Sequence, residues 1–225
     1  YEDLKMIKKK LKIIPILTNV QDEQKINEVI KIFKVDTIYH AAAFKHVPIV
    51  EANICEGVLN NIFGTFIVAK AAINHSVSNF VLISTDKAVR PTNIMRATKR
   101  LAEICVQSLY HYNKKTTKMS IVRFGNVIES SGSFIPKLKK QISLGGPVTL
   151  THPDVSRNFM TTQEAAELVM HAGAMSENCD VFVLEMGERV KIKELIYKII
   201  QLSGLRVKDK DNPRGDIEVK IIGLR

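Results

Sequence analysis

The sequence is poor in cysteine, with only three in 225 residues. Cys55, Cys105 and Cys179 lie far apart and show no CxxC or Cys/His spacing of the kind that binds zinc. We therefore expect three reduced and mostly buried thiols, as suits a reducing cytoplasm, and we expect neither a metal site nor a disulfide.

Long apolar runs are also absent. A membrane-spanning helix needs about 18 consecutive apolar residues, whereas the most apolar stretch, Ile62 to Ile73, is shorter and contains Lys70. The first residues, Tyr1-Glu2-Asp3-Leu4, have no initiator Met and no apolar signal-peptide core. These observations predict a fragment of a longer protein that does not itself span a membrane.

A Gly-rich phosphate loop is missing as well. Neither GxxGxxG nor GxGxxG occurs, and Gly132, Gly145 and Gly146 have the wrong spacing. If the chain forms a dinucleotide-binding sheet, we expect the first strand, the phosphate loop and the acidic residue that holds the ribose upstream of Tyr1.

Negative charge is in short supply: 33 Lys and Arg against 23 Asp and Glu give a net charge of +10. Much of the excess lies in Lys-rich stretches such as 8–10 and 137–140. A nucleic-acid partner is one interpretation. We favour solvated helix faces and expect no nucleic-acid partner, because aromatic and basic residues are not interleaved. The charge would still help to attract an anionic diphosphate.

Hydrophobic patterning predicts alternating strands and helices. We expect strands at 13–17, 36–43, 79–85, 119–124, 180–186 and 216–222, and helices at 22–34, 48–75, 94–110 and 191–203. This alternation predicts an α/β fold with a doubly wound parallel sheet, Rossmann-like but without its N-terminal strand. We expect a truncated dinucleotide-binding sheet at 1–128. Residues 129–225 would form a smaller, mainly substrate-binding lobe whose chain crosses back to the sheet.

Small and polar residues gather near the ends of these elements. Ala41, Ala42 and Ala43 close one strand and would let a ligand approach the backbone, although tight packing explains them equally well. Asn60 and Asn61 lie inside a predicted helix, where Asn costs stability. Their amides therefore need hydrogen-bonding partners.

The segment from Ser84 to Lys99 gives the strongest signal. A buried strand ends in Ser84-Thr85-Asp86-Lys87, and the chain then enters a helix on which Met95 and Lys99 share a face. A surface salt bridge is the alternative for Asp86 and Lys87. We favour a site, because ligands of doubly wound sheets bind at the carboxyl ends of the strands.

Together with HAAAFKHVP, NNIFGT, VRFGNV, SSGSFIP and GGPVTLTHPDVSRNFMT, this segment resembles the UDP-N-acetylglucosamine 4,6-dehydratases. These are extended short-chain dehydrogenase/reductases of polysaccharide biosynthesis, and the resemblance covers nearly the whole chain. Met95 matches the position at which one branch has Met for the Tyr of a YxxxK pair, and Arg96 departs from the family's Gly. The Met branch resembles membrane-anchored proteins, which implies a location in the cytoplasm or at the cytoplasmic face of the inner membrane.

The resemblance implies NAD(P)-dependent 4,6-dehydration of a UDP-N-acetylhexosamine, most simply UDP-N-acetylglucosamine, with NAD favoured over NADP. It assigns catalysis to Thr85, Asp86, Lys87, Met95 and Lys99. It places the cofactor at Ala41, Ala42, Ala43, Asn60, Ser84, Lys99, Phe124, Gly125 and Val127. It places the substrate at Lys45, His46, Asn126, Arg157 and Arg225. A homo-oligomer paired through helices near 50–75 and 94–111 is also implied.

Elementary chemistry suits the two central roles. Asp86 would protonate the departing C6 hydroxyl and Lys87 would remove the C5 proton, while Thr85 would hydrogen-bond the C4 oxygen. Burial of the pair would favour the neutral forms that these roles need. A UDP-sugar 4-epimerase or reductase of the same superfamily is an alternative, as is a catalytically inactive remnant.

Overall fold

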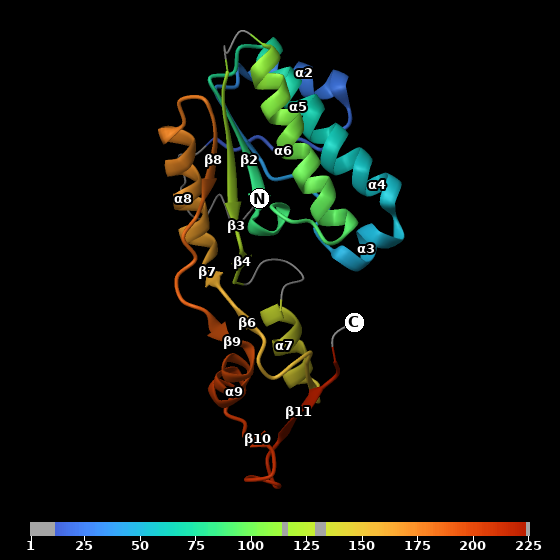
Figure 1. The fold of residues 1–225 in the computed structure, drawn as a ribbon, viewed down its shortest axis with the longest axis vertical. Coiled ribbons are helices and arrows are strands. Elements are labelled where there is room, and N and C mark those ends of the chain that lie inside the picture. Colours follow the sequence, from blue (N-terminus) through green and yellow to red (C-terminus); the bar gives the residue numbers. More distant parts are fainter. Residues whose placement is uncertain (1–11, 114–116, 129–133, 224–225) are drawn as a thin grey trace. The chain divides into compact units, whose positions relative to one another are not determined.

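The structure is a computed structural model that describes residues 12–113, 117–128 and 134–223 (Figure 1). It divides into two compact units. Unit 1 contains the described residues up to Leu82, together with Ala88–Ile121 and Ser176–Asp180. Unit 2 contains Ile83–Lys87, Val122–Met175 and the residues from Val181 onward. The predicted domain boundary between 128 and 129 stays a prediction.

A four-stranded sheet runs through the chain in the order β1 (Thr37–His40), β2 (Asn79–Thr85), β3 (Lys118–Phe124) and β8 (Cys179–Val183). β1 and β2 are parallel, with Thr37 opposite Asn79 and His40 opposite Leu82. The middle of β2 is fully buried from Phe80 to Leu82, as expected for a parallel strand covered on both faces. The predicted α/β fold with a parallel sheet is confirmed.

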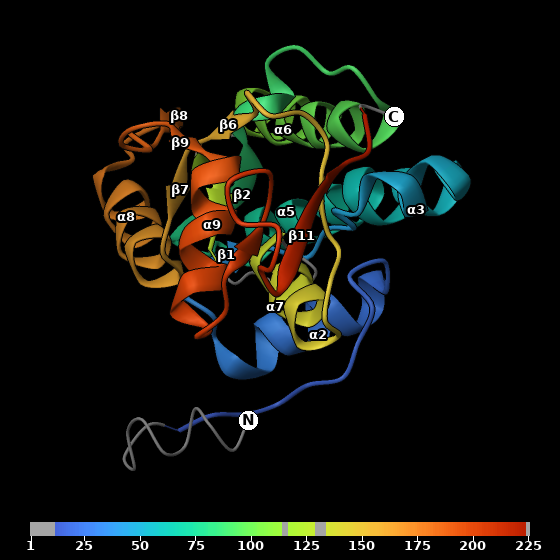
Figure 2. The same ribbon diagram turned by 90° about the horizontal axis from the view of Figure 1, so that it is seen from below.

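Three helices build the core of unit 1 with these strands. α5 (Thr65–Asn74) lies between α2 (Glu23–Phe33) and α6 (Ile94–Tyr112) (Figures 1 and 2). Asp22 caps α2: its Oδ1 accepts a hydrogen bond from Lys25 N at 2.9 Å. The buried faces of α5 and α6 pack against Phe80 and Ile121 through small and β-branched side chains, among them Val68, Ala72, Ala102 and Val106.

The predicted strand at 13–17 is wrong. The segment is irregular, and Leu17 is fully exposed. β1 is the outermost strand on that side of the sheet order, so no strand pairs with this segment in the described part of the chain. Apolar composition alone does not make a strand when its backbone groups have no neighbour to bond.

The predicted helix at 48–75 is broken into four pieces. α3 (Val47–Ala52) ends at Asn53, whose φ of −138° and ψ of 60° are not helical. α4 (Ile54–Val58) then leads into η1, a π-helix over Leu59–Gly64, and on into α5. Gly64 packs closely here: a Cβ would lie 2.7 Å from Val20 Cγ2, so a larger residue would require Val20 to shift. The π-helix turns Asn60 and Asn61 into the interior.

Unit 2 has its own core around a small parallel sheet of β10 (Val207–Lys208), β11 (Ile217–Ile221) and β5 (Val148–Leu150). α7 (Phe134–Ser143) and α9 (Ile192–Leu202) cover this sheet with an aliphatic cluster that includes Leu138, Ile142, Ile196 and Ile200. The remaining elements are α8 (Thr162–Met175), a parallel pair of β4 (Asn126–Val127) with β7 (Phe159–Met160), and an antiparallel pair of β6 (Ser156–Arg157) with β9 (Val190–Lys191).

The three cysteines are free, but their expected burial is wrong for Cys55, which is exposed on α4. Cys179 is half-buried, and burial together with the charge of Asp180 raises the pKa of its thiol to about 11. Such a thiol is unreactive at neutral pH. In the described residues, no helix combines the length and apolar character that a membrane crossing requires.

Candidate active site

The predicted acid–base pair lies in unit 2, directly after β2. The strand ends at Thr85, and Asp86 and Lys87 form η2, a single 3₁₀ turn with Ala88. Asp86 Oδ1 accepts hydrogen bonds from Lys87 Nζ at 2.8 Å and from Thr85 Oγ1 at 3.0 Å. The expected burial is wrong: the side chains of Asp86 and Lys87 are 45% and 31% exposed. The pair is therefore open to a ligand.

Gly125 brings two further segments to this pair. It joins β3 to β4, and its N–H donates to Met186 Sδ at 3.2 Å. A Cβ on Gly125 would lie 3.1 Å from Met186 Cε and 3.4 Å from Asp86 Oδ2. Met186 follows β8, so the residues after three strands meet here. Sequence reasoning missed Met186, because nothing in its local pattern marks it.

The predicted substrate residues of unit 2 have varied surroundings. Asn126 donates through Nδ2 to the carbonyl of Asn158 at 3.3 Å, and Asn158 donates to the carbonyl of Gly187 at 2.8 Å. Arg157 is exposed, and its Nη1 donates to the carbonyl of Ser156 at 3.0 Å. Phe124 and Val127 are half-buried on either side of Gly125. Arg225 lies outside the described residues.

Unit 1 contains a buried polar network centred on Asn61, which is 1% exposed. Asn61 Oδ1 accepts from Phe44 N at 2.8 Å and from Asn60 Nδ2 at 3.0 Å. Its Nδ2 donates to Phe44 O and to Thr98 Oγ1, each at 3.0 Å. All four hydrogen bonds that an amide side chain can make are formed. The network joins the loop after β1 to η1 and α6, and the expected need for partners is confirmed.

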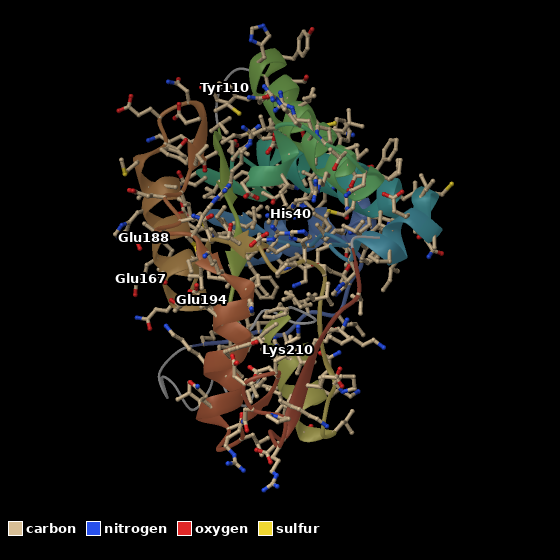
Figure 3. The ribbon with its side chains drawn as sticks, turned by 60° about the horizontal axis from the view of Figure 1, so that its bottom comes forward. His40, Tyr110, Glu167, Glu188, Glu194 and Lys210 are labelled. Carbon is tan, nitrogen blue, oxygen red and sulfur yellow. The ribbon has the colours of Figure 1, made fainter. Side chains whose placement is uncertain are left out.

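His40 extends this network at the end of β1 (Figure 3). Thr65 Oγ1 donates its only proton to the carbonyl of Asn61 at 2.7 Å, so the 3.0 Å contact with His40 requires His40 Nε2 to be the donor. The ring stacks on Phe80 at 5.9 Å. Burial, and next the charge of Lys99, lower the pKa of His40 to about 4. His40 is therefore neutral at physiological pH.

Met95 and Lys99 lie one turn apart on α6, as predicted. Burial lowers the pKa of Lys99 to about 8, although the nearby carboxylate of Glu103 acts in the opposite direction. Thr98, next to Lys99, donates to the carbonyl of Met95 at 2.7 Å and so ties this turn to the Asn61 network. The guanidinium of Arg96 turns back to Thr92 Oγ1 at 2.7 Å. The expected convergence of Lys99 with Asp86 and Lys87 stays a prediction.

The remaining predicted residues of unit 1 lie in and around the loop after β1. Ala41 and Ala42 are exposed and Ala43 is half-buried, while Lys45 and His46 are exposed. The small side chains of the three alanines would allow a nucleotide to approach the backbone closely. Asn60 is less suited to hold one, because its amide is buried and donates to Asn61. Ser84, near the end of β2, is also buried.

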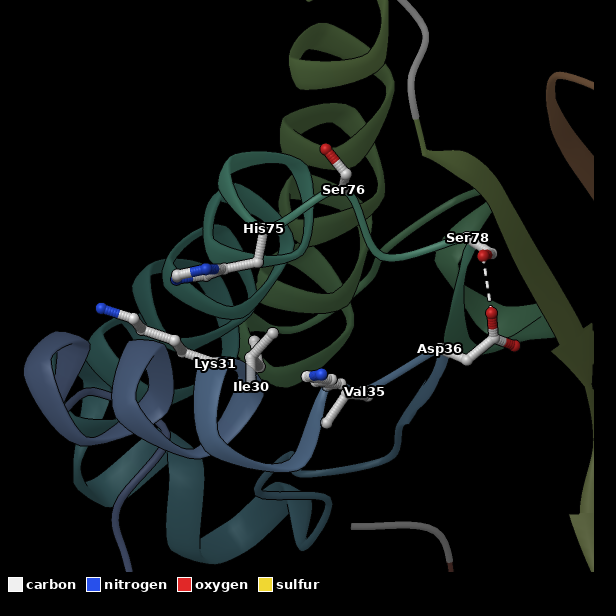
Figure 4. Close-up of a pocket in the computed structure, with 8 residues that line it drawn as sticks. Ile30, Lys31, Val35, Asp36, His75, Ser76 and Ser78 are labelled. Atoms are coloured by element: carbon white, nitrogen blue, oxygen red, sulfur yellow. Dashed lines mark hydrogen bonds between the residues drawn. The ribbon is translucent and has the colours of Figure 1, made fainter.

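A separate cavity of about 350 Å³ lies in unit 1 at the amino ends of β1 and β2 (Figure 4). Its wall includes Lys31, Lys34 and His75, and Ser78 Oγ donates to Asp36 Oδ1 at 2.6 Å beside it. No predicted site residue lines this cavity. Across the described ranges, no group of three His, Cys, Asp or Glu is arranged to hold a metal ion.

The sequence matches the family described as polysaccharide biosynthesis protein over residues 2–225. It is 51% identical over 200 residues to the capsular polysaccharide biosynthesis protein CapD of Staphylococcus aureus, a match that covers 89% of this chain and 33% of CapD. The UDP-glucose 4-epimerase of Rickettsia akari is 33% identical over 183 residues, which cover 81% of this chain and 53% of the epimerase. The chain thus spans a third to a half of the length of these relatives.

Among solved structures, Pen from Bacillus thuringiensis superposes with a TM-score of 0.87 at 31% identity. The superposition covers 99% of this chain and 67% of Pen.

Proposed function

This chain belongs to the polysaccharide biosynthesis protein family, and on that premise we propose that it catalyses the NAD(P)-dependent 4,6-dehydration of a UDP-N-acetylhexosamine. UDP-N-acetylglucosamine is the substrate that we propose. The product would be a 4-keto-6-deoxy sugar nucleotide used to build a surface polysaccharide or another glycan. The family lies within the enzymatic superfamily of nucleotide-sugar epimerases and dehydratases.

The observation that supports this reaction best is the pair of Asp86 and Lys87. Elimination of water across C5 and C6 needs a base for the C5 proton and an acid for the departing C6 hydroxyl. The chain presents one candidate for each role, 2.8 Å apart and accessible, at the carboxyl end of β2. Ligands of doubly wound sheets bind at that end of the strands.

The reactive forms of the pair are a protonated Asp86 and a neutral Lys87. As an ion pair, Asp86 is an acceptor only and Lys87 has no free lone pair. The C4 hydroxyl would supply the proton of Asp86, and Lys87 would lose its proton to solvent before it acts as the base. A bound sugar would displace water from both side chains, and loss of water disfavours the charged forms relative to the neutral ones.

The residues of unit 1 fit a nicotinamide nucleotide in part, because Ala41 and Ala42 leave the end of β1 open, although no Gly-rich phosphate loop is present in this sequence. When bound, the nicotinamide would supply the redox chemistry of the reaction. Lys99 would hydrogen-bond the ribose. Met95 has no exchangeable proton, so the C4 hydroxyl would pass its proton to Thr85 or Asp86.

The UDP moiety would lie against polar residues of β4 and β6. We propose Asn126 and Arg157 as its contacts, because an exposed guanidinium can bind a phosphate through two parallel hydrogen bonds. Lys45 and His46 are exposed after β1 and would contact the sugar. The net charge of +10 favours the approach of this anionic substrate.

A 4-epimerase is the second candidate, and the identity to the Rickettsia akari epimerase favours it. Epimerases of this superfamily relay the C4 proton through a Tyr side chain. This chain has Met95 at that position. Epimerisation also needs no base at C5, which would leave the Asp86–Lys87 pair without a role. We therefore prefer dehydration. A catalytically inactive remnant is the third possibility, and the same assay separates all three.

The test is to incubate the complete protein that contains this chain with UDP-N-acetylglucosamine and NAD and to measure the mass of the product by mass spectrometry. Dehydration predicts a product lighter by one water, which disappears in Asp86→Asn and in Lys87→Met. Glu23→Gln is the matched control, because Glu23 forms a comparably exposed ion pair with Lys70 at 3.0 Å. A product of unchanged mass but altered C4 configuration would establish the epimerase, and binding of UDP without any product would establish the remnant.

We also propose that two copies pair through unit 1. Large apolar side chains are exposed on α4 and η1, at Ile54, Leu59 and Phe63, and on the adjoining α6, at Leu101 and Ile104. α6 packs beside both η1 and α4, so these side chains form a neighbouring set that a second copy could cover. Light scattering should give a dimer for the wild type and a monomer for Leu101→Glu. A monomeric wild type would refute the proposal.

A further inference from the structure

The two oxygens of the Asp86 carboxylate have different surroundings. Oδ1 accepts from both Lys87 Nζ and Thr85 Oγ1. Oδ2 has no donor among the described residues of the chain and faces Gly125, where it would lie 3.4 Å from a Cβ. A proton placed on Oδ1 would displace one of two existing donors. A proton on Oδ2 would displace none.

Gly125 also contacts Met186. The Gly125 N–H donates to Met186 Sδ at 3.2 Å, and the terminal methyl of Met186 covers the space in which a side chain would project. The segment leading to Met186 is anchored to the end of β3, because Leu184 N donates to Arg123 O at 2.9 Å. Gly125 is thus held between Met186 on one side and Asp86 Oδ2 on the other.

We propose that Met186 is a positioning residue for the dehydration: it holds Gly125 against Asp86, so that Oδ2 is the oxygen that delivers the proton to the departing C6 hydroxyl. The proposal rests on the proposed function of Asp86. In the step itself, Lys87 takes the C5 proton and the electron pair of the C5–H bond forms the C5=C6 double bond, while the C6–O bond breaks and the oxygen takes the proton from Oδ2. The hydroxyl leaves as water, and Asp86 is left as a carboxylate whose Oδ1 still accepts hydrogen bonds from Lys87 and Thr85.

The contacts with Met186 and Asp86 also limit the size of the side chain at position 125. The φ of Gly125 is not in the left-handed region, so its backbone does not require glycine. The constraint comes from space: a Cβ would lie 3.1 Å from Met186 Cε, which is tight, and 3.4 Å from Asp86 Oδ2, which is ordinary van der Waals contact. The tight contact is with the far end of a flexible side chain. Alanine at position 125 should therefore displace Met186, and Asp86 should be disturbed through the loss of the contact between Met186 and Gly125.

Met186 has a simpler alternative role as a flexible filler of space. The two roles differ in what they require of the side chain. A filler needs only volume, which leucine supplies, since Met-to-Leu exchange is usually well tolerated. A positioning residue also needs the sulfur as an acceptor, which leucine lacks. Met186→Leu therefore separates the roles, and Met170→Leu on the exposed face of α8 is the matched control.

The experiment compares Met186→Leu, Gly125→Ala and the double variant Gly125→Ala with Met186→Ala in the complete protein. Two readouts do not depend on turnover: hydrogen exchange of the Gly125 amide, and titration of the Asp86 carboxyl carbon by NMR. Turnover of UDP-N-acetylglucosamine and its pH profile form the third readout.

We expect Met186→Leu to speed exchange of the Gly125 amide about tenfold. It should also lower kcat about tenfold, shift the pH profile, and leave KM nearly unchanged. Gly125→Ala should lower kcat about a hundredfold. The double variant should recover about tenfold of that loss, because the added Cβ then has room. Met170→Leu should change none of these quantities.

The proposal is overturned if the Asp86 titration in Met186→Leu and in Gly125→Ala matches the wild type. It is also overturned if the double variant is no better than Gly125→Ala alone. A wild-type protein that gives no lighter product refutes the proposed function instead. In that case the amide exchange and the Asp86 titration still decide whether Met186 positions Asp86.

Discussion

The main polar side chains of the two units differ in burial and in how many of their hydrogen bonds are formed within the protein. In unit 1, Asn61 is buried and makes all the hydrogen bonds available to it, and it joins the loop after β1 to η1 and α6. In unit 2, Asp86 and Lys87 bond mainly to each other and to Thr85, and they remain open to solvent. A saturated buried network fixes a backbone, whereas an exposed pair keeps capacity for a ligand. The proposed function accordingly gives unit 1 the role of a framework and places the proton chemistry in unit 2.

The largest predicted effect removes the acid from unit 2. Asp86→Asn keeps the shape of the side chain but cannot deliver a proton, so water loss should slow by about a thousandfold. Thermal stability should change little, because the ion pair with Lys87 is exposed. Product formation is followed by mass spectrometry and unfolding by calorimetry. If C4 oxidation and elimination both continue at the wild-type rate, the assignment of Asp86 is wrong.

The second prediction concerns stability and not activity, and it removes Asn61 from the centre of the unit 1 network. Asn61→Ala deletes four hydrogen bonds and leaves groups of Phe44, Asn60 and Thr98 unpaired, of which those on Asn60 and Thr98 are buried. We expect a loss of about 3 kcal/mol in the free energy of unfolding, measured with urea. Asn53→Ala is the matched control, because Asn53 is exposed and donates one hydrogen bond, to Ile49 O at 2.9 Å. Equal losses in the two variants would contradict the special role of Asn61.

The third prediction concerns the buried, neutral His40. The pKa of His40 is about 4 in the folded chain, compared with the ordinary histidine value of 6.5 that applies to the unfolded chain. As pH falls from 6.5 to 4, the unfolded chain binds a proton that the folded chain does not, so stability falls. The loss should be about 3 kcal/mol across this range. His40→Gln should flatten this part of the curve of unfolding free energy against pH, whereas His152→Gln, at an exposed position, should not.

The smallest effect is expected from Lys99. Its pKa is about 8 in the folded chain against a reference of 10.5, because burial disfavours the charged form. Stability should rise by about 2 kcal/mol as pH increases from 8 to 10, where the folded chain has lost a proton that the unfolded chain retains. Lys99→Met should remove this rise. An unchanged slope in the variant would show that Lys99 is not the group responsible.

Local patterns predicted the elements that depend on local interactions. β2 was expected at 79–85 and spans Asn79–Thr85, because a continuous apolar run suits a buried parallel strand. α2 was expected at 22–34 and spans Glu23–Phe33, with Asp22 as its N-cap. The helix at 48–75 was not predicted correctly, since the π-helix at Leu59–Gly64 depends on partners for Asn61 that lie 17 and 37 residues away.

The candidate site was predictable to a similar extent. The order of residues in Ser84 to Lys99 pointed to Asp86 and Lys87, and these two do form a close pair. Their exposure was not predictable, because it depends on how the rest of unit 2 packs around η2. Met186 could not be predicted from the sequence as a site residue, because its contact with Gly125 joins segments that are 61 residues apart.

The most direct test of the proposed proton chemistry is turnover of UDP-N-acetylglucosamine by the complete protein in D₂O. If Lys87 removes the C5 proton and Asp86 releases the C6 hydroxyl, the product will be lighter by one water and will have solvent deuterium bonded to C5. Lys87→Met should form no such product. A product of unchanged formula with no carbon-bound solvent deuterium would contradict the account, because the acid–base pair after β2 would then have no part in the reaction.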